Sequence, residues 1–278
     1  MKIALTGSTG FIGTHVRRLL SSADHDVLLV VRNQSAVHLL GQNEKVLLAD
    51  IGEVREDWFN YLGRPDVLLH LAWGGLPNYL DQYHVDVELP LQVNFLTKIV
   101  RSGLRNLVVT GTCYEYGLAS GALGEGQETN PNTPYGVAKD RLRKSVSVLH
   151  HEYDFKFTWA RIFYPYGEGQ SELSIYSQLK RAVLDEERKF KMSSGKQALD
   201  FIPVESVASA LVSLSTNQEG MGIINIGSGK PQTVLDFIQD QIQKLGAQIV
   251  PLVGAIQDRK FESHAFWADI SKLKSLNI

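Results

Sequence analysis

The chain has 278 residues, of which 44% are hydrophobic and 21% charged, with a formal net charge of -2. This is the composition of an ordinary globular protein, long enough for one large domain with a small appendage. The balanced charge gives no reason to expect nucleic acid or a membrane surface as a partner. The single cysteine, Cys113, excludes an intrachain disulfide framework. No apolar run is long enough for a signal peptide or a membrane span, so we expect a cytoplasmic protein.

Short apolar segments alternate with amphipathic ones through the first two thirds of the chain. The expected strands are Lys2–Thr6, Val27–Val31, Lys45–Ala49, Val67–Leu71, Asn106–Thr110 and Lys156–Phe163. The expected helices between them include Phe11–Ser21, Val85–Ser102 and Tyr135–His151. Strands that are apolar throughout and separated by helices predict a parallel sheet covered on both faces. The fold class is therefore α/β, a doubly wound, Rossmann-like sheet.

The pattern changes after Pro165. A polar helical stretch, Ser171–Glu187, leads into a basic segment, and Phe201–Ser215 with the strand-like Gly222–Ile226 then indicates a return to the sheet. Thr233–Leu245 and the C-terminal tail have no place in that sheet. We therefore expect a main domain over 1–165 with 199–230, and a smaller discontinuous lobe over 166–198 with 231–278.

A glycine-rich turn follows the first strand: Thr6–Gly13 reads T-G-S-T-G-F-I-G. Gly7 permits the tight turn, Gly10 lets the backbone approach a pyrophosphate, and Gly13 allows close packing of helix and strand. The helix that begins here offers its N–H groups to an anion. Such a motif alone is weak, but at the first strand–helix junction of an α/β pattern it predicts that the main domain binds a dinucleotide.

Two residues at the ends of the next strands bear on which dinucleotide is bound. Arg32 lies 19 residues after Gly13, where an acidic residue usually binds the NAD ribose and an arginine can hold the 2′-phosphate of NADP. The alternative is a surface arginine at the strand end. We expect NADP, with NAD possible. Asp50 is either an adenine contact or a solvated loop residue.

The stretch T-P-Y-G-V-A-K-D, residues 133–140, places Tyr135 one helical turn before Lys139. The same spacing recurs at Tyr176 and Lys180. Spacing alone cannot separate a proton-transfer pair from one face of an ordinary helix, so the choice depends on the rest of the sequence.

Several motifs occur together and in order along almost the whole chain. They are the glycine turn, H-L-A-W at 70–73, the threonine-rich strand end at 110–112, P-N-T-P-Y-G-V-A-K at 131–139, R-I-F-Y-P-Y-G-E-G-Q at 161–170, D-F-I-P-V-E-S-V-A at 200–208, N-I-G-S-G-K at 225–230 and A-D-I-S-K at 268–272. Together they resemble the extended short-chain dehydrogenase/reductases, the nucleotide-sugar epimerases, dehydratases and 4-ketoreductases. The stretches G-T-C-Y-E-Y-G and A-W-G-G-L-P-N-Y look most like dTDP-linked deoxysugar 4-ketoreductases.

The resemblance implies a catalytic set of Thr112, Tyr135 and Lys139. Tyr135 is then the acid/base, Lys139 favours its phenolate and holds the nicotinamide ribose, and Thr112 hydrogen-bonds the substrate carbonyl. Thr110 is the competing hydroxyl. Gly111 departs from the serine common at that position. In this interpretation Tyr176 and Lys180 form a surface turn of the smaller lobe or a substrate-side contact.

The resemblance also implies ligand contacts, and we expect no metal. His70 should serve the cofactor loop. Tyr164 stands where related epimerases often carry asparagine, which casts doubt on that contact. Expected substrate contacts in the smaller lobe and nearby are Tyr114, Tyr164, Gln170 and Arg259. Expected cofactor contacts, besides Tyr135 and Lys139, are Gly7, Thr9, Gly10, Phe11, Ile12, Gly13, Arg32, Asp50, Ile51, Leu71, Ala72 and Trp73.

The favoured function is an NADP-dependent reductase of a nucleotide-activated 4-keto-6-deoxy sugar, with a nucleotide sugar as partner. The alternative is a nucleotide-sugar 4-epimerase with tightly bound NAD, against which Arg32 argues. Retention of the Thr–Tyr–Lys set argues against a non-catalytic dinucleotide sensor. A dehydratase would need an Asp–Glu pair near Thr112, and only Glu115 is there. Family resemblance implies a homodimer through the helices at 85–102 and 135–151.

Overall fold

Seven parallel strands form the central sheet of this computed structural model, which describes residues 1–33, 40–217, 219–258 and 263–278. The spatial order of the strands is β12-β7-β5-β4-β1-β2-β3. The chain runs from β1 outward to β2 and β3, and then returns to place β4 on the other side of β1. The junction of β1 and β4 is therefore the switch point where open α/β sheets bind ligands. The strands are β1 (Lys2–Thr6), β2 (Asp26–Val31), β3 (Glu44–Leu48), β4 (Val67–His70), β5 (Asn106–Thr112), β7 (Lys156–Ile162) and β12 (Gly222–Ile226).

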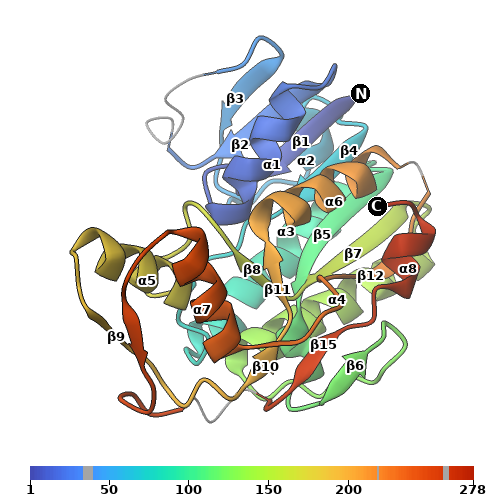
Figure 1. The fold of residues 1–278 in the computed structure, drawn as a ribbon. Coiled ribbons are helices and arrows are strands. Elements are labelled where there is room, and N and C mark those ends of the chain that lie inside the picture. Colours follow the sequence, from blue (N-terminus) through green and yellow to red (C-terminus); the bar gives the residue numbers. More distant parts are fainter. Residues whose placement is uncertain (34–39, 218, 259–262) are drawn as a thin grey trace.

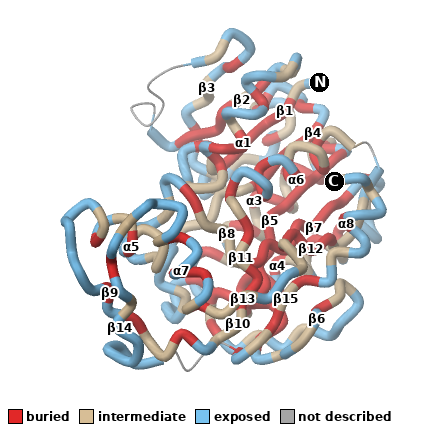
Figure 2. Tube along the Cα trace, in the orientation of Figure 1, coloured by how far each residue is buried: buried red, intermediate tan, exposed pale blue. Residues whose placement is uncertain are grey.

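Helices cover both faces of the sheet (Figure 1). Successive side chains of β1 alternate between the two cores: Ile3 and Leu5 pack on one face and Ala4 on the other. Figure 2 shows the strands at the centre as mostly buried. The first face carries α1 (Phe11–Ser21), α6 (Val204–Thr216) and α8 (Ser271–Ser275), and the second carries α2 (Trp58–Tyr61), α3 (Leu89–Arg101) and α4 (Pro134–Glu152).

A third apolar core lies outside the sheet, built around α5 (Ile175–Leu184) and α7 (Val234–Lys244). Phe237 of α7 stacks on Phe201 with ring centroids 3.9 Å apart. The strand pairs here are β8 (Tyr164–Tyr166) with β11 (Phe201–Pro203), β9 (Lys189–Lys191) with β14 (Val250–Leu252), β6 (Gly121–Leu123) with β15 (Phe266–Ala268), and β10 (Ala198–Leu199) with β13 (Gln232–Thr233).

The predicted α/β fold class is confirmed by this sheet. The first strand and helix have the predicted limits, whereas β5 runs two residues further, to Thr112. The expected helix at 85–102 begins with a π-helical turn, His84–Glu88, before α3. No helix in the described part of the chain is long and apolar enough to cross a membrane.

The division into a main domain (1–165 with 199–230) and a smaller lobe (166–198 with 231–278) stays a prediction. The C-terminal segment that was expected in the smaller lobe sends α8 back to the sheet, where Leu273 joins the first core. Lys272 Nζ donates hydrogen bonds to the carbonyls of Met221 and Ile223, at 2.7 Å each. The C-terminal segment with α8 therefore packs beside β12, the edge strand of the sheet.

A buried aspartate, Asp200, ties the end of β12 to the third apolar core. Its carboxylate is fully buried and accepts backbone N–H bonds from Ser228 (2.6 Å), Gly229 (3.0 Å) and Ala268 (2.9 Å). The Ser228 hydroxyl donates a further bond of 2.6 Å. Three sequence motifs that lie far apart, at 200–208, 225–230 and 268–272, therefore meet at one side chain.

We expect Asp200→Asn to lower the free energy of unfolding by about 2–3 kcal/mol, because an amide cannot accept all four bonds and leaves buried donors unpaired. Urea denaturation followed by circular dichroism measures the loss. Asp269→Asn is the matched control: among the described residues this exposed carboxylate receives bonds only from Ser271, and water can replace it. Equal losses of unfolding free energy in the two variants would contradict the stabilising role of the Asp200 hydrogen bonds.

Candidate active site

The glycine turn lies at the switch point and leaves no space for side chains. Gly7 has φ +73°, and a Cβ there would lie 2.7 Å from the Ala72 nitrogen. A Cβ on Gly13 would lie 1.9 Å from the Gly7 oxygen. Gly10 is the N-cap of α1, so the helix begins at the turn and presents free N–H groups beside it. Thr9, Phe11 and Ile12 complete this cradle, which fits the pyrophosphate of a dinucleotide.

The loop after β4, Leu71–Gly75, is held against the glycine turn by a buried polar chain. Thr6 Oγ1 accepts the Ala72 N–H at 3.3 Å and donates to His70 Nδ1 at 2.8 Å. His70 Nε2 donates to Gln92 Oε1 at 2.5 Å, and Gln92 Nε2 donates to the Ala72 carbonyl at 3.1 Å. Burial lowers the pKa of His70 to about 3, which keeps the imidazole neutral for this donor–acceptor arrangement.

The chain of bonds ends at a buried carboxylate, Glu88. It accepts bonds from the Gly74 N–H (2.9 Å), Gln92 Nε2 (2.7 Å) and the Tyr83 hydroxyl (3.1 Å). Both backbone groups of Ala72 and the N–H of Gly74 are thereby satisfied without water. The loop that carries Leu71, Ala72 and Trp73 is rigid as a result.

Arg32, which was predicted to select NADP, and Asp50, which was considered as an adenine contact, follow neighbouring strands of the sheet. Arg32 follows β2 and is exposed. Asp50 follows β3 and is exposed, and its carboxylate accepts the Gly52 N–H at 2.9 Å; Ile51 between them is half-buried. The structure therefore leaves the Arg32 side chain accessible to a ligand at the end of β2.

The predicted catalytic residues converge from β5 and α4. The Thr112 side chain lies near enough to the Tyr135 phenol to lower its pKa. Lys139 Nζ lies 4.0 Å from the centre of the Trp73 ring and donates to the Thr110 carbonyl at 2.9 Å. The Thr110 hydroxyl is directed to the His70 carbonyl, at 3.4 Å. Thr112, rather than Thr110, is therefore the hydroxyl beside Tyr135.

Burial acts on the two ionisable groups in opposite senses. It raises the pKa of the Tyr135 phenol, helped by the charges of Tyr79, Glu115 and Cys113 and opposed by the Thr112 side chain. Burial lowers the pKa of Lys139 to about 7, against the charges of Glu115 and Glu88, which raise it. The protein alone thus holds the proton on Tyr135, and a positive charge next to the phenol would favour its release.

Four aromatic rings surround Tyr135. The centroid distances are 5.3 Å to His84, 5.5 Å to Tyr79, 5.9 Å to Trp73 and 6.2 Å to Tyr114. Two hydrogen bonds hold the His84 ring in place here: Nδ1 accepts from Trp73 Nε1 at 3.1 Å, and Nε2 donates to the Asn78 carbonyl at 2.9 Å. The phenol therefore sits in an aromatic enclosure with its hydroxyl at Thr112.

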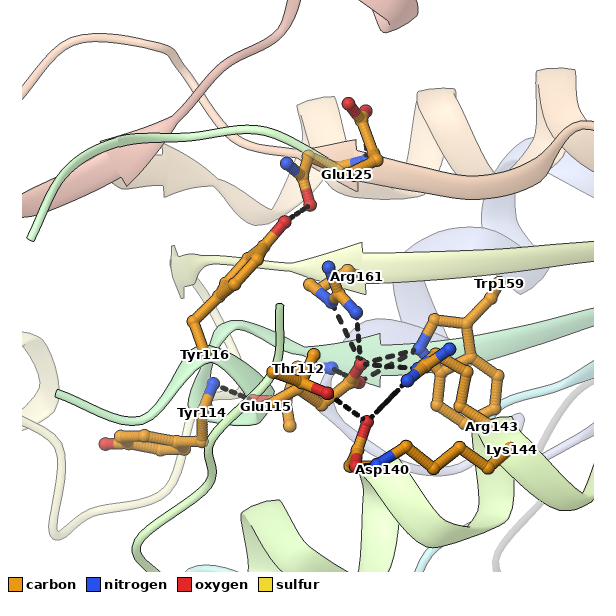
Figure 3. A network of polar contacts seen from close by, with 12 residues as sticks. Thr112, Tyr114, Glu115, Tyr116, Glu125, Asp140, Arg143, Lys144, Trp159 and Arg161 are labelled. Carbon is orange, nitrogen blue, oxygen red and sulfur yellow. Dashed lines mark hydrogen bonds and ion pairs between the residues drawn. The ribbon is translucent and has the colours of Figure 1, made fainter. Parts of the chain in front are cut away.

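Glu115, the acid considered for dehydration, points away from this enclosure into the sheet. Figure 3 shows its carboxylate against Arg161 and Trp159. The distances are 2.8 Å to an Arg161 terminal nitrogen and 2.9 Å to Trp159 Nε1, and Glu115 is fully buried. A Cβ on Gly111 would lie 2.1 Å from Trp159 Nε1. The indole therefore explains why glycine replaces the usual serine, and Glu115 is not free to act on a substrate.

The predicted substrate contacts fall in two places. Tyr164 lies 6.2 Å from Tyr114, ring to ring, so both belong to the aromatic enclosure or its border. Gln170 lies further out, on the rim of an open cavity of about 880 Å³ beside α5. Arg259 lies outside the described residues.

The second Tyr–Lys pair faces that cavity and not the sheet edge. Lys180 pairs with Glu168 at 2.6 Å and lies 5.9 Å from the Tyr176 ring. Both residues are on α5, in the smaller lobe. Neither residue approaches Thr112 in the arrangement described above.

Sequence reasoning missed Glu88, Gln92 and His84, whereas Tyr79 lies in the segment 77–83 that was expected to line the pocket. A signal was present: His84, Glu88 and Gln92 recur every fourth residue and continue directly into the buried Phe95, Leu96 and Ile99 of α3. Polar residues in a buried stripe need partners and so mark a network. Among the described residues no group of three or more His, Cys, Asp or Glu side chains could hold a metal.

Comparison with known proteins agrees with this architecture. The chain is 26% identical over 269 residues to dTDP-6-deoxy-L-talose 4-dehydrogenase (NAD(+)) of Aggregatibacter actinomycetemcomitans, covering 96% of this chain and 99% of that one. It is 25% identical to GDP-6-deoxy-D-mannose reductase of Pseudomonas aeruginosa, over 86% of this chain and 78% of that one. The structure of UDP-N-acetylglucosamine 4-epimerase from Methanobrevibacter ruminantium superposes with a TM-score of 0.88 at 21% identity, covering 100% and 92% of the chains.

The family model for the NAD dependent epimerase/dehydratase family matches residues 3–227. The match includes the glycine turn, the loop after β4, and Thr112, Tyr135 and Lys139. The chain is an enzyme of the NAD-dependent epimerase/dehydratase family, of the extended short-chain dehydrogenase/reductase type.

Proposed function

We propose that the protein is an NADP-dependent reductase of a nucleotide-activated 4-keto-6-deoxy sugar, acting at C4. The observation that carries the proposal is the meeting of Tyr135, Thr112 and Lys139 at the switch point, next to a glycine turn that fits a dinucleotide. Two relatives that act on 6-deoxy sugars support the choice of substrate class, since one of them matches over 99% of its length.

The chain's own residues supply binding, orientation and a proton. The bound nicotinamide supplies the hydride. Thr112 donates a hydrogen bond to the C4 oxygen, and Tyr135 gives its proton to that oxygen as negative charge develops on it. Lys139 stabilises the phenolate that remains. Burial suits this direction of reaction, because it keeps the proton on Tyr135 until the acceptor forms.

The aromatic enclosure supports an apolar substituent on the sugar. The rings of Tyr79, Trp73 and Tyr114 approach Tyr135 at 5.5–6.2 Å. Such rings favour the C–H faces of a sugar and a methyl group over a charged carboxylate. A 6-deoxy sugar presents that methyl group at C6.

A nucleotide-sugar 4-epimerase is the second candidate. A putative UDP-glucose 4-epimerase of Methanocaldococcus jannaschii is 26% identical over 99% of this chain. An epimerase would use the same three residues in both directions at C4 and would retain its cofactor. The two functions therefore differ in whether reduced cofactor is consumed.

The accessible Arg32 supports NADP, through a bond to the 2′-phosphate, although the first relative above is named for NAD(+). A homodimer through α3 and α4 and a cytoplasmic location remain predictions. Val148 of α4 is 56% exposed, as an apolar residue in such an interface would be in the isolated chain.

The purified protein should oxidise NADPH when mixed with one member of a panel of dTDP-, GDP- and CDP-linked 4-keto-6-deoxy sugars. Loss of absorbance of the reduced nicotinamide measures the reaction. Interconversion of UDP-hexoses without added cofactor, and no NADPH oxidation on any of the panel, would favour the epimerase instead.

In the same assay Tyr135→Phe should abolish turnover and spare cofactor binding, because only the proton donor is lost. Tyr176→Phe is its matched control and should keep near-normal turnover. The reverse result would show that the pair on α5 had been wrongly rejected.

Arg32→Gln should raise KM for NADPH by about 10-fold or more, the effect of losing a charged hydrogen bond, and leave KM for NADH little changed. Initial rates with both cofactors give the ratio. Arg18→Gln removes the same charge from an exposed position on α1 and should not alter it. An unchanged NADPH/NADH ratio in Arg32→Gln would assign the site to NAD.

The rate of reduction should be constant below pH 7 and fall above it. The pKa of Lys139 is lowered to about 7, so its cation is present below that pH and lost as pH rises through it. The phenolate left on Tyr135 then loses its stabilising charge. The measurement is kcat against pH at saturating substrates, and a flat profile up to pH 9 would contradict the assignment.

A further inference from the structure

The buried Glu115 has no part in the mechanism above, yet it makes more polar contacts than any catalytic side chain described here. Its carboxylate accepts bonds from the Thr112 N–H (2.9 Å), Trp159 Nε1 (2.9 Å) and Arg161 Nε (2.9 Å). Arg161 also pairs with it through a terminal nitrogen at 2.8 Å, and both side chains are fully buried. Arg143 of α4 approaches to 3.7 Å (Figure 3).

The contact with Thr112 is a capping box that orients the catalytic hydroxyl. Thr112 is the N-cap of the 3₁₀ turn Cys113–Tyr116, and its Oγ1 accepts the Tyr114 N–H at 3.3 Å. Glu115, at the third position of the turn, returns a bond to the Thr112 N–H. With one lone pair of Thr112 Oγ1 engaged, the hydroxyl proton remains available for an oxygen in the site.

The other side of the carboxylate is fixed to the neighbouring strand. Gly111 of β5 lies opposite Arg161 of β7 in the sheet register. The Arg161 guanidinium also lies 4.2 Å from the centre of the Tyr116 ring. The absence of a side chain at Gly111 lets Trp159 reach Glu115. A movement of Thr112 would therefore break contacts made by two strands and a helix.

Glu115 is also one of several charged or titratable groups around Tyr135 and Lys139. The others that face this pair are Tyr79 in the loop after β4, Cys113 in the 3₁₀ turn, Glu88 and His84 in the π-helical turn, and His70 at the end of β4. Glu115 raises the pKa of Tyr135, and it is the largest charge that raises the pKa of Lys139.

We propose that Glu115 is a positioning residue of the reaction: it locks Thr112 against β7 and supplies a fixed negative charge beside Tyr135 and Lys139. The inference rests on the proposed reductase, in which Tyr135 must remain a proton donor. The geometry stands on hydrogen bonds to Thr112, Trp159 and Arg161, and the charge effect on pKa agrees with it. Glu115 acts through its neighbours and touches no reacting atom.

The test is Glu115→Gln, which keeps the size of the side chain and removes its charge. Loss of the Thr112 anchor should lower kcat on the order of 10²-fold, as small displacements of catalytic groups do. KM for the cofactor should change by less than about twofold, since the glycine turn is untouched. The fall of kcat at high pH should move to lower pH by roughly one unit, because Lys139 loses a neighbouring anion and Arg161 is left unpaired.

Two further variants separate position from charge. Glu115→Asp keeps the charge but retracts the carboxylate from Thr112, so kcat should fall without a shift of the pH profile. Asp140→Asn is the matched control: Asp140 pairs with the same Arg143, at 2.7 Å, but makes no bond to Thr112, so kcat and the profile should both stay unchanged.

Circular dichroism and cofactor binding establish which variants fold. A folded Glu115→Gln protein with normal kcat and a normal profile would overturn the proposal, as would an equal shift in Asp140→Asn. If Glu115→Gln does not fold, Glu115→Asp decides: normal kcat in it would overturn the positioning role.

A measurement independent of turnover keeps this inference distinct from the proposed function. The NMR signal of ¹³C-labelled Lys139, identified by its absence in Lys139→Arg, should titrate with a midpoint near 7 and shift to lower pH in Glu115→Gln. If the Lys139 midpoint shifts in Glu115→Gln but the protein turns over no 4-keto-6-deoxy sugar, the proposed substrate is wrong and the role of Glu115 is supported. An unmoved midpoint in a folded variant would overturn the charge effect.

Discussion

Backbone groups that follow the ends of buried parallel strands must find partners without water, and three buried carboxylates provide them here. Glu88 accepts the Gly74 N–H after β4, Glu115 accepts the Thr112 N–H at the end of β5, and Asp200 accepts N–H groups after β12. Each carboxylate lies on a different element from the backbone N–H groups that it accepts. Together they fix the segments that follow β4, β5 and β12, and the first two of these segments carry rings of the aromatic enclosure.

Two of these carboxylates, Glu88 and Glu115, also influence the pKa values at the site. Burial alone would take Lys139 far from its charged form, and the two glutamates oppose that tendency. Glu115 also acts against phenolate at Tyr135. A phenol that keeps its proton beside a lysine that titrates near neutrality suits an enzyme that delivers protons rather than one that removes them.

Periodicity and glycine placement were enough to predict the sheet, the cradle and the order of the elements. These features depend on local sequence: apolar strands, the turn at Gly7–Gly13, and a proline at the start of α4. Some partners of Glu88 and Glu115 are local, such as Gln92 and Thr112, but the bonds that tie Glu115 and Asp200 to other parts of the fold were not predictable, because they join residues distant in the chain. Glu115 and Arg161 are 46 residues apart, and Asp200 and Ala268 are 68 apart. The register of β5 against β7 brings Arg161 to Glu115, and the packing of segments outside the sheet brings Ala268 to Asp200.

The tight fit of the Trp159 indole over Gly111 has a consequence for how this chain can vary. A serine at position 111 would clash with the Trp159 indole, so the indole would have to move. A tryptophan at position 159 therefore requires a residue without a Cβ atom at position 111. Neither position can mutate first without a clash or a void. The two positions are therefore sterically coupled, and a substitution at one is expected to be tolerated only together with a compensating substitution at the other.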